Sequence, residues 1–373
     1  EMLLIKKITN LIKFFLIVIF ITFSLSLLID FFFGKKILEV TDNFWKETEF
    51  YGRIKRIDHS VYHHGLKPNV KMENAKGFLG YYNFCTDNHG FRYKCDIQRG
   101  KKFDYGFMGD SFTEGASVTY ENSFVGIFED KTKKKVANLG VVSYAPKIYL
   151  SKLNYYLEKG YEFNHVVVVI DISDLYDDNV YYRLKENFIV DENYERGERL
   201  KLRKFLRKNF PFTNFYMFVL KNLNNVGYSP EKISNKEPNF HKDVITKAKW
   251  TYTKSDSIDG YWGSIKDAQS EMIQSMTELY KILKSKDIKL SLVVFPWPQQ
   301  LQNDTVDSKH VLMWREFCKN KCEKFINLFP TFFNEKNKNG YLETYKKYYW
   351  WNDMHFNVEG NRLVAQEILK SLK

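Results

Sequence analysis

The alternation of apolar and polar positions divides the chain into one long apolar run near the N-terminus and a longer part of mixed periodicity. Apolar residues fill most of the run from Phe14 to Phe33, which carries a single charge, Asp30. A helix needs about 20 residues to cross about 30 Å of hydrocarbon, and the run has this length. Because core helices of such length usually keep a polar face, the run predicts a membrane-spanning helix rather than a buried one.

Lysines lie on both sides of the run, three before it and two after it: Lys6, Lys7, Lys13, Lys35 and Lys36. This excess predicts that the N-terminus stays in the cytoplasm. No small-residue cleavage pattern closes the run, so we expect an uncleaved signal anchor. The first predicted unit is therefore 1–36, a cytoplasmic tip and a single-pass anchor in the cytoplasmic membrane. The remaining chain is expected on the periplasmic or extracellular side.

After the anchor, residues 37–102 form a lead-in of short strands and turns that we expect to pack on the following domain. From residue 103 onward, short apolar strands alternate with longer amphipathic helices. The predicted strands are Phe103–Met108, Val136–Leu139, Val166–Ile170, Leu290–Phe295 and Phe325–Leu328. The predicted helices are Ser123–Lys134, Lys147–Leu157, Ala268–Lys286, Met313–Phe325 and Val358–Leu372. This alternation predicts an α/β domain with a parallel sheet over residues 103–373.

The alternation is broken at about 183–262, which we expect to be an insertion. It holds a basic run, with Arg196, Arg199, Lys201, Arg203, Lys204, Arg207 and Lys208. An aromatic helix follows, for which Thr213 is the expected N-cap. Two interpretations remain open for this segment: contact with a membrane surface or a glycan, and a solvated helix face that covers the sheet. The second is the more common role of such charges.

Charge and cysteine content change this picture only slightly. A formal net charge of +12 admits nucleic acid, anionic lipid or an acidic glycan as partner, but an exported domain does not meet nucleic acid. Four cysteines are too few for a disulfide scaffold. Cys85 and Cys95 flank a turn-like stretch and are candidates for a disulfide. Cys318 and Cys322 lie one turn apart in a predicted helix, where a disulfide fits poorly and no further metal ligands are apparent.

The strongest candidate for chemistry is Ser111, which follows Gly109 and Asp110 at the end of the first predicted strand. A serine in a turn from strand to helix is exposed at the carboxyl edge of a parallel sheet, where such sheets bind ligands. Its own backbone N–H can stabilise an oxyanion there. Because a serine hydroxyl is a weak nucleophile at neutral pH, it needs an adjacent base.

The candidate base is His355, with Asp353 two residues before it in the turn that precedes the last helix. In an irregular turn this spacing lets the carboxylate reach the ring N–H and leaves the other ring nitrogen for the serine. Asn357 is the predicted N-cap of the last helix. Ser111, His355 and Asp353 together predict a catalytic triad at the correct ends of an α/β chain.

These motifs resemble the SGNH/GDSL hydrolase superfamily, including its membrane-anchored bacterial members and the SGNH domains of glycan O-acetylation proteins. The similar segments are Gly109-Asp110-Ser111 (block I), Asn138-Leu139-Gly140 (block II), Asp353-x-His355 (block V) and Thr86–Arg92, a stretch that often precedes block I. The resemblance covers about residues 86–182 and 262–372. It implies a three-layer α/β/α, flavodoxin-like fold and a serine hydrolase that acts on ester bonds. We expect no cofactor and no metal.

The resemblance also implies an oxyanion hole, formed by the backbone N–H groups of Ser111 and Gly140. Block III normally adds an asparagine side chain, but Ser173 stands at that position here. A hydroxyl is shorter than an amide, so three outcomes remain open: Ser173 serves as the third donor, Asn179 replaces it, or the enzyme is slow. Removal of one oxyanion donor lowers turnover by about 10²–10³-fold in enzymes of this kind.

Acidic and aromatic side chains near these motifs are candidates for substrate binding: Asp110, Asp171, Asp174, Trp297 and Trp351. Asp171 and Asp174 would either orient Ser173 or bind sugar hydroxyls. The tryptophans would stack on sugar rings, although a role in the core suits them equally. Arg92 is expected to be a buried arginine that satisfies backbone carbonyls.

Three functions are compatible with these residues. The preferred one is an esterase that hydrolyses acyl esters, in particular acetyl esters, on cell-envelope glycans. The second is a glycan O-acetyltransferase that uses the same triad together with a membrane acyl-donor protein. The third is a catalytically inactive protein that binds the cell envelope.

Overall fold

The computed structural model describes residues 2–48, 55–78, 80–193, 202, 205–206, 208–222 and 237–372. The chain divides into two compact units. The first contains residues 1–53 and 194–229, and the second contains residues 54–193 and 230–373. Of the predicted basic run, Lys208 is described and exposed. The other six basic residues lie outside the described residues: Arg196, Arg199, Lys201, Arg203, Lys204 and Arg207.

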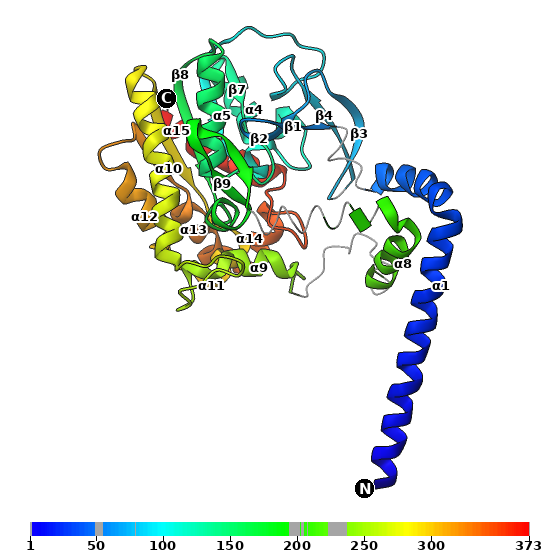
Figure 1. Cartoon of the computed structure of the whole chain (residues 1–373). Coiled ribbons are helices and arrows are strands. Elements are labelled where there is room, and N and C mark those ends of the chain that lie inside the picture. The colour runs from blue at the N-terminus through cyan, green and yellow to red at the C-terminus, as the bar shows by residue number, and fades with distance from the viewer. Residues whose placement is uncertain are drawn as a thin grey trace. The chain divides into compact units, whose positions relative to one another are not determined.

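Within the described part of the first unit, helix α1 (Met2–Thr48) and helix α8 (Pro211–Asn222) pack against each other (Figure 1). The stretch Asn10–Val40 of α1 is long and apolar enough to cross a membrane. Only 6% of its most apolar 18-residue segment is buried within the protein. The predicted span lies inside this stretch, but α1 continues beyond residue 36, where the anchor was expected to end. Helix α8 starts two residues before Thr213, its predicted cap.

A five-stranded parallel sheet forms the centre of the second unit. Its strands are β6 (Lys102–Met108), β7 (Val136–Asn138), β8 (Glu162–Ile170), β11 (Lys289–Val294) and β12 (Lys324–Asn327), in the order β12-β11-β8-β6-β7. This order is that of flavodoxin-like folds and confirms the predicted fold class. Strand β8 begins four residues earlier than predicted, because its first residues alternate between exposed and buried instead of forming an apolar run.

Helices cover both faces of this sheet. The right-handed crossovers place α4 (Phe124–Thr132) and α15 (Val358–Leu372) on one face, and α5 (Pro146–Glu158) and α10 (Ile265–Ser285) on the other (Figure 1). The other α-helices described in this unit are α3 (Ser111–Glu114), α6 (Asp174–Tyr176), α9 (Lys242–Ala248), α11 (Pro298–Asn303), α12 (Lys309–Cys318), α13 (Phe329–Asn339) and α14 (Tyr341–Tyr348). The carbonyl of Asn357 accepts from the N–H of Asn361 and its side chain accepts from Gly360, as the predicted N-cap requires.

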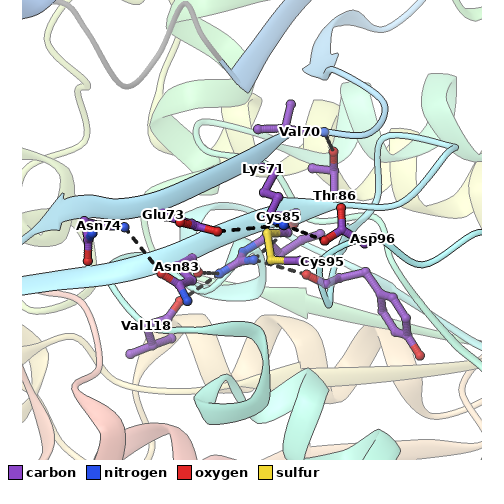
Figure 2. The surroundings of a disulfide bond; sticks show 12 residues. Val70, Lys71, Glu73, Asn74, Asn83, Cys85, Thr86, Cys95, Asp96 and Val118 are labelled. Carbon is purple, nitrogen blue, oxygen red and sulfur yellow. Dashed lines mark hydrogen bonds and ion pairs between the residues drawn. A yellow bond between two sulfur atoms is a disulfide. The ribbon is translucent and has the colours of Figure 1, made fainter.

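The lead-in forms two small antiparallel sheets of its own. They are the pair β1 (Arg56–His59) and β2 (His63–Leu66), and the three strands β3 (Lys71–Gly77), β4 (Gly80–Thr86) and β5 (Arg92–Tyr93). Figure 2 shows the disulfide of Cys85 and Cys95, which joins β4 to the chain after β5. The predicted pairing of these two cysteines is therefore present. In the insertion, the hairpin of β9 (Tyr182–Leu184) and β10 (Val190–Glu192) stays with the second unit.

The second disulfide corrects an expectation. Cys318 and Cys322 are bonded, with a Cα–Cα distance of 4.7 Å. The predicted helix was expected to continue to Phe325, but α12 ends at Cys318. Cys322 lies beyond the end of the helix, in a turn in which its N–H donates to the carbonyl of Cys318. The two cysteines can therefore approach each other more closely than they could in a continuous helix.

Arg92 is buried, with 1% of its surface exposed, and holds the lead-in to the rest of the unit. Its guanidinium donates to the carbonyls of Asn83 and Cys85 on β4 and to that of Val118, at 2.9–3.1 Å. It also lies over the ring of Phe84, 4.3 Å from the centroid. The expected role of Arg92 in satisfying backbone carbonyls is confirmed.

Substitution of Arg92 by methionine tests this role. The variant removes the donors for several buried carbonyls, each of which costs about 1–3 kcal/mol when left without a partner. We expect the free energy of unfolding, measured by urea denaturation, to fall by at least about 3 kcal/mol. The matched control is Arg183→Met, at an exposed arginine paired with Asp191, which should change stability by less than about 1 kcal/mol. Equal effects of the two variants would contradict the assignment.

Candidate active site

The predicted functional residues gather at the carboxyl edge of the sheet. Ser111 follows β6, Gly140 follows β7, and Ser173 follows β8. His355 arrives from the loop between α14 and α15. Open parallel sheets bind ligands at this edge, because the loops after successive strands meet there.

The turn that presents Ser111 depends on a glycine and an aspartate. A Cβ atom on Gly109 would lie 2.8 Å from the carbonyl oxygen of Val169, so the turn passes too close to β8 for any side chain at this position. Asp110 caps α3 by accepting from the N–H of Phe112 at 2.9 Å. The helix ends after one turn at Gly115, whose φ of 83° lies in the left-handed region. Ser111 thus stands at the start of a single-turn helix at the sheet edge.

The imidazole of His355 contacts both of its predicted partners. Its Nε2 lies 2.7 Å from Ser111 Oγ, and its Nδ1 lies 2.5 Å from Asp353 Oδ1. A carboxylate can only accept, so Nδ1 carries the ring hydrogen and Nε2 of the neutral ring accepts from the serine hydroxyl. The structure therefore brings these three residues together in the arrangement that a serine nucleophile requires.

The loop that carries His355 is fixed by its neighbours. The hydroxyl oxygen of Tyr345 on α14 lies 2.7 Å from the carbonyl oxygen of Trp350 and 3.0 Å from that of Asp353, and it accepts from Asp353 N at 3.1 Å. Trp350 N donates to the His355 carbonyl at 2.9 Å, and His355 N donates to Asp353 Oδ1 at 2.8 Å. These bonds hold the ring in place before any substrate binds.

Two phenylalanines lie against the imidazole. The ring of Phe112, directly after the serine, lies 4.8 Å from that of His355, and Phe78 at the tip of the β3–β4 hairpin stacks on it at 5.5 Å. Both Ser111 and His355 are buried, at 6% and 8% exposed. Phe78 was not anticipated from the sequence, because a single aromatic residue at a hairpin tip gives no signal that it will cover a distant histidine.

Three buried carboxyl groups lie behind the serine: Asp110, Asp171 and Asp174. Burial raises the pKa of Asp110 well above its ordinary value, and the adjacent charge of Asp171 raises it further. Burial, followed by the charges of Asp171 and Asp110, also raises the pKa of Asp174. Ionised neighbours repel one another, so Asp110 and Asp174 hold their protons to a higher pH than isolated aspartates do. Ser111 Oγ lies 3.1 Å from Asp110 and closer to His355, which assigns its proton to the imidazole.

Two of the three predicted oxyanion donors already donate hydrogen bonds to other residues of the protein. Gly140 N donates to Asn138 Oδ1 at 3.0 Å, and the Ser173 hydroxyl donates to Asp171 Oδ1 at 2.8 Å. The alternative donor, Asn179, is also engaged, with its amide donating to the carbonyls of Leu175 and Ala268. Among the described residues, the N–H of Ser111 has no acceptor in the protein. It is the one predicted donor that is uncommitted before a substrate binds.

Glu114, the last residue of α3, ties the nucleophile turn to two other segments. Its carboxylate accepts from Val142 N at 2.9 Å, in the loop after Gly140, and from Lys55 Nζ at 2.6 Å in the lead-in. Burial alone would raise the pKa of Glu114, but the charges of Lys55 and Arg56 lower it to about 2. Glu114 is therefore ionised at neutral pH and holds the loop after Gly140 beside the serine. The sequence analysis did not identify Glu114 as a functional residue, although a glutamate three residues after Ser111 is a signal that could have been followed.

Four predicted substrate-binding residues have internal roles instead. Trp297 is 1% exposed and donates through Nε1 to Asp171 Oδ2 at 3.1 Å, so it presents no face to a sugar. Trp351 is also buried, against Tyr345. Asp171 and Asp174 are at most 1% exposed, with Asp174 accepting from the Tyr149 hydroxyl. Of the alternatives left open by the sequence, the core role fits the two tryptophans, and the orienting role fits Asp171, which accepts from the N–H and the hydroxyl of Ser173. Sugar contacts by Asp171, Asp174 and Trp297 do not fit this degree of burial.

The remaining predictions concern metals and cofactors. Among the described residues, no group of three or more His, Cys, Asp or Glu side chains could hold a metal ion. His63 and His64, adjacent in β2, contact each other through Nδ1, and His64 Nε2 lies 2.9 Å from the carbonyl oxygen of Val142. Burial lowers the pKa of His64 to about 3, so its ring is neutral at physiological pH.

No family model matches the chain, and no curated protein matches its sequence. Solved structures match at low identity. The acetylxylan esterase Axe2 from Geobacillus stearothermophilus is 14% identical, with 74% of this chain and 95% of Axe2 covered and a TM-score of 0.39. A member of the lipolytic protein G-D-S-L family from Veillonella parvula is 10% identical, with 73% and 98% covered and a TM-score of 0.38. At such values the function has to be argued from the site itself.

The carboxyl cluster predicts a particular dependence of stability on pH. Since the pKa of Asp174 is raised in the folded state, the folded protein retains a proton that the unfolded chain releases near pH 4. Stability therefore falls as the pH rises from about 4 toward the raised pKa. We expect Asp174→Asn to flatten this fall, measured by urea denaturation between pH 4 and 8. Exposed Asp259→Asn is the control and should keep the wild-type slope. A variant slope as steep as that of the wild type would refute the cluster's role.

Proposed function

We propose that this chain is a serine esterase of the SGNH/GDSL type, acting through Ser111, His355 and Asp353. The observation that supports this most strongly is the 2.7 Å contact between Ser111 Oγ and His355 Nε2, with Asp353 at 2.5 Å from the other ring nitrogen. The serine lies at the carboxyl edge of a parallel sheet, at the start of a one-turn helix, where a backbone N–H can stabilise an oxyanion.

The geometry supports a two-step acyl transfer. Ser111 Oγ attacks the ester carbonyl while its proton passes to His355 Nε2, and Asp353 stabilises the resulting imidazolium. The tetrahedral oxyanion collapses, the imidazolium protonates the leaving alcohol, and an acyl-serine remains. Water, deprotonated by the same imidazole, then attacks the acyl-serine and releases the acid.

In the absence of substrate, the oxyanion pocket lacks one of the two backbone donors that the mechanism requires. The N–H of Ser111 has no acceptor within the described part of the chain, but that of Gly140 is bonded to the Asn138 side chain. Rotation of the Asn138 amide would release the Gly140 N–H for the oxyanion. Catalytic hydrogen bonds often form only in the substrate complex, so this requirement agrees with the mechanism and predicts slow turnover if the rotation is costly.

The proposed substrate class is an acyl ester, in particular an acetyl ester, on a cell-envelope glycan. Helix α1 provides a stretch that can anchor the chain in the cytoplasmic membrane with the esterase domain on the periplasmic or extracellular side. The two disulfides support this side, because such bonds persist in oxidising compartments. Partners would be the acylated glycan and the membrane, without nucleic acid.

A glycan O-acetyltransferase is the second candidate, and the burial of the site favours it. Ser111 and His355 are at most 8% exposed, and Phe78 stacks on the imidazole. A covered acyl-serine is shielded from water, which favours a bound sugar hydroxyl as acceptor. A membrane acyl-donor protein would then supply the acyl group. Transfer of acetyl to an added oligosaccharide, with slow hydrolysis in its absence, distinguishes this function from an esterase.

Substitution of the serine tests catalysis directly. We expect Ser111→Ala to lower the hydrolysis of p-nitrophenyl acetate by at least about 10³-fold, because the nucleophile is lost. A fluorophosphonate probe should label Ser111 in the wild-type protein and fail to label the variant. Exposed Ser270→Ala on α10 serves as the control and should react normally. If the wild-type protein neither hydrolyses the ester, transfers its acyl group nor takes up the probe, an inactive envelope-binding protein becomes the better description.

Substitution at the block III position tests the third oxyanion donor. Because the Ser173 hydroxyl donates to Asp171, we expect Ser173→Ala to change kcat by less than about threefold. Ser173→Asn should leave kcat unchanged or raise it, by up to about 10²-fold if the amide reaches the oxyanion. Steady-state kinetics with p-nitrophenyl acetate measures both. A large loss in Ser173→Ala would mean that the hydroxyl turns from Asp171 to the oxyanion during the reaction.

A further inference from the structure

Asp30 is an unusual residue for an apolar helix that can span a membrane. It lies within the predicted span of α1, and 7% of its surface is exposed. A carboxylate near the centre of a membrane helix costs about 2.5–3.5 kcal/mol on insertion scales, unless it is paired or lies close to the interface. Such a residue is therefore expected to have a partner.

The partner of Asp30 is the N-terminus of α8. Its carboxylate accepts from Phe212 N at 2.6 Å, from Thr213 N at 3.0 Å and from Thr213 Oγ1 at 2.6 Å. Pro211 occupies the first position of α8 and has no N–H to satisfy. The free donors and the positive end of the helix dipole both favour an anion at this point. Asp30 thus provides the cap that the sequence analysis assigned to Thr213.

Small residues of α1 allow this contact. Ser26, one turn before Asp30, is buried, and its Oγ lies 3.1 Å from Thr213 Oγ1. Gly34, one turn after Asp30, faces the ring of Pro211, which would lie 3.8 Å from a Cβ atom at this position. The helices are therefore joined along two turns of α1, with the carboxylate in the middle.

Apolar side chains remain exposed on α8 and on the segment before it: Leu202, Phe205, Leu206, Tyr216 and Met217. Exposed Lys208 and Asn209 lie between them in the sequence. Asp30 is three residues before Phe33, about 4.5 Å from the predicted end of the span at 1.5 Å per residue. The capped end of α8 therefore lies at the boundary of hydrocarbon and headgroups. Apolar residues with a neighbouring cation are typical of a helix that lies in this boundary.

We infer that α8 is a second membrane-binding element, held at its N-terminus by Asp30 and with its exposed apolar residues in the bilayer interface. The occupant of this apolar surface is lipid rather than a second copy of the chain, because α8 is bonded to a helix whose own apolar surface has to be covered by the bilayer. The insertion then returns the chain to the membrane. The chain therefore passes between the first and the second unit three times, near residues 53, 194 and 230, instead of once. The inference depends on the membrane span of α1 and not on the esterase activity.

Disulfide trapping tests the contact between the two helices. The four native cysteines are all in disulfides, so introduced thiols are the only free ones. We expect Ser26→Cys with Thr213→Cys in the full chain, reconstituted in phosphatidylethanolamine–phosphatidylglycerol vesicles, to form an intramolecular disulfide readily. The matched control is Leu25→Cys with Thr213→Cys, because Leu25 is exposed on another side of α1. It should cross-link at least tenfold more slowly, and equal rates would overturn the contact.

Nitroxide accessibility tests the lipid contact. A spin label at Met217→Cys should be relaxed more strongly by oxygen than by a water-soluble nickel chelate, whereas a label at Ser270→Cys on the exposed face of α10 should show the reverse. Preferential access of the nickel chelate to position 217 would overturn the inference. Disulfide formation between two chains through position 217 would also overturn it, by identifying a second copy as the occupant.

Removal of the cap tests the role of Asp30. We expect Asp30→Leu to reduce the cross-linking rate of the Ser26→Cys, Thr213→Cys pair at least tenfold, because α8 loses its N-terminal acceptor. Asp30→Asn should retain much of the rate, since asparagine is also a good N-cap. Unchanged cross-linking in Asp30→Leu would show that the carboxylate does not hold the helix. Membrane insertion of α1 itself is checked by carbonate extraction of each variant.

Discussion

A single hydrogen bond, between Ser111 Oγ and His355 Nε2, joins segments that are 244 positions apart in the chain. It depends on the parallel sheet, which brings the end of β6 and the loop after α14 to the same edge. Gly109 allows the nucleophile turn to pass against β8, and Tyr345 holds the histidine loop by two carbonyls. The lead-in adds Phe78, which covers the imidazole. The site is therefore assembled from nearly the whole length of the second unit.

Buried carboxyl groups around this bond differ in protonation for a simple reason. Glu114 has Lys55 and Arg56 beside it, and these cations lower its pKa despite complete burial. Among the described residues, no lysine or arginine offsets the burial of Asp110 and Asp174, and Asp171 lies beside them, so burial and mutual repulsion raise their pKa values. The ionised glutamate holds backbone in place, whereas the raised pKa values of Asp110 and Asp174 limit the negative charge behind Ser111.

A buried carboxylate also needs stabilising partners in the first unit, where Asp30 lies in an apolar helix. A carboxylate in apolar surroundings has to find donors, and here the N-terminus of α8 supplies them. In the sequence, Asp30 interrupts an apolar run. In the structure it is the residue by which an insertion distant in sequence is attached to the anchor.

The sequence by itself predicted the five strands, the main helices and a parallel sheet, because local periodicity and the ends of elements specify them. The flavodoxin-like fold followed from the family resemblance, and the motifs at the ends of elements singled out Ser111, His355 and Asp353, which the structure brings together. The tertiary structure alone decided which acceptors the predicted oxyanion donors bind and which aromatic side chains are buried. Gly140 N turned out to be bonded to Asn138, Ser173 to Asp171, and Trp297 to lie in the core. Likewise, the end of α12 at Cys318 allows the disulfide with Cys322 that a continuous helix disfavours. The reason is physical: a residue's backbone conformation is set largely by its neighbours in sequence, whereas the partners of its side chain are set by segments that only folding brings near.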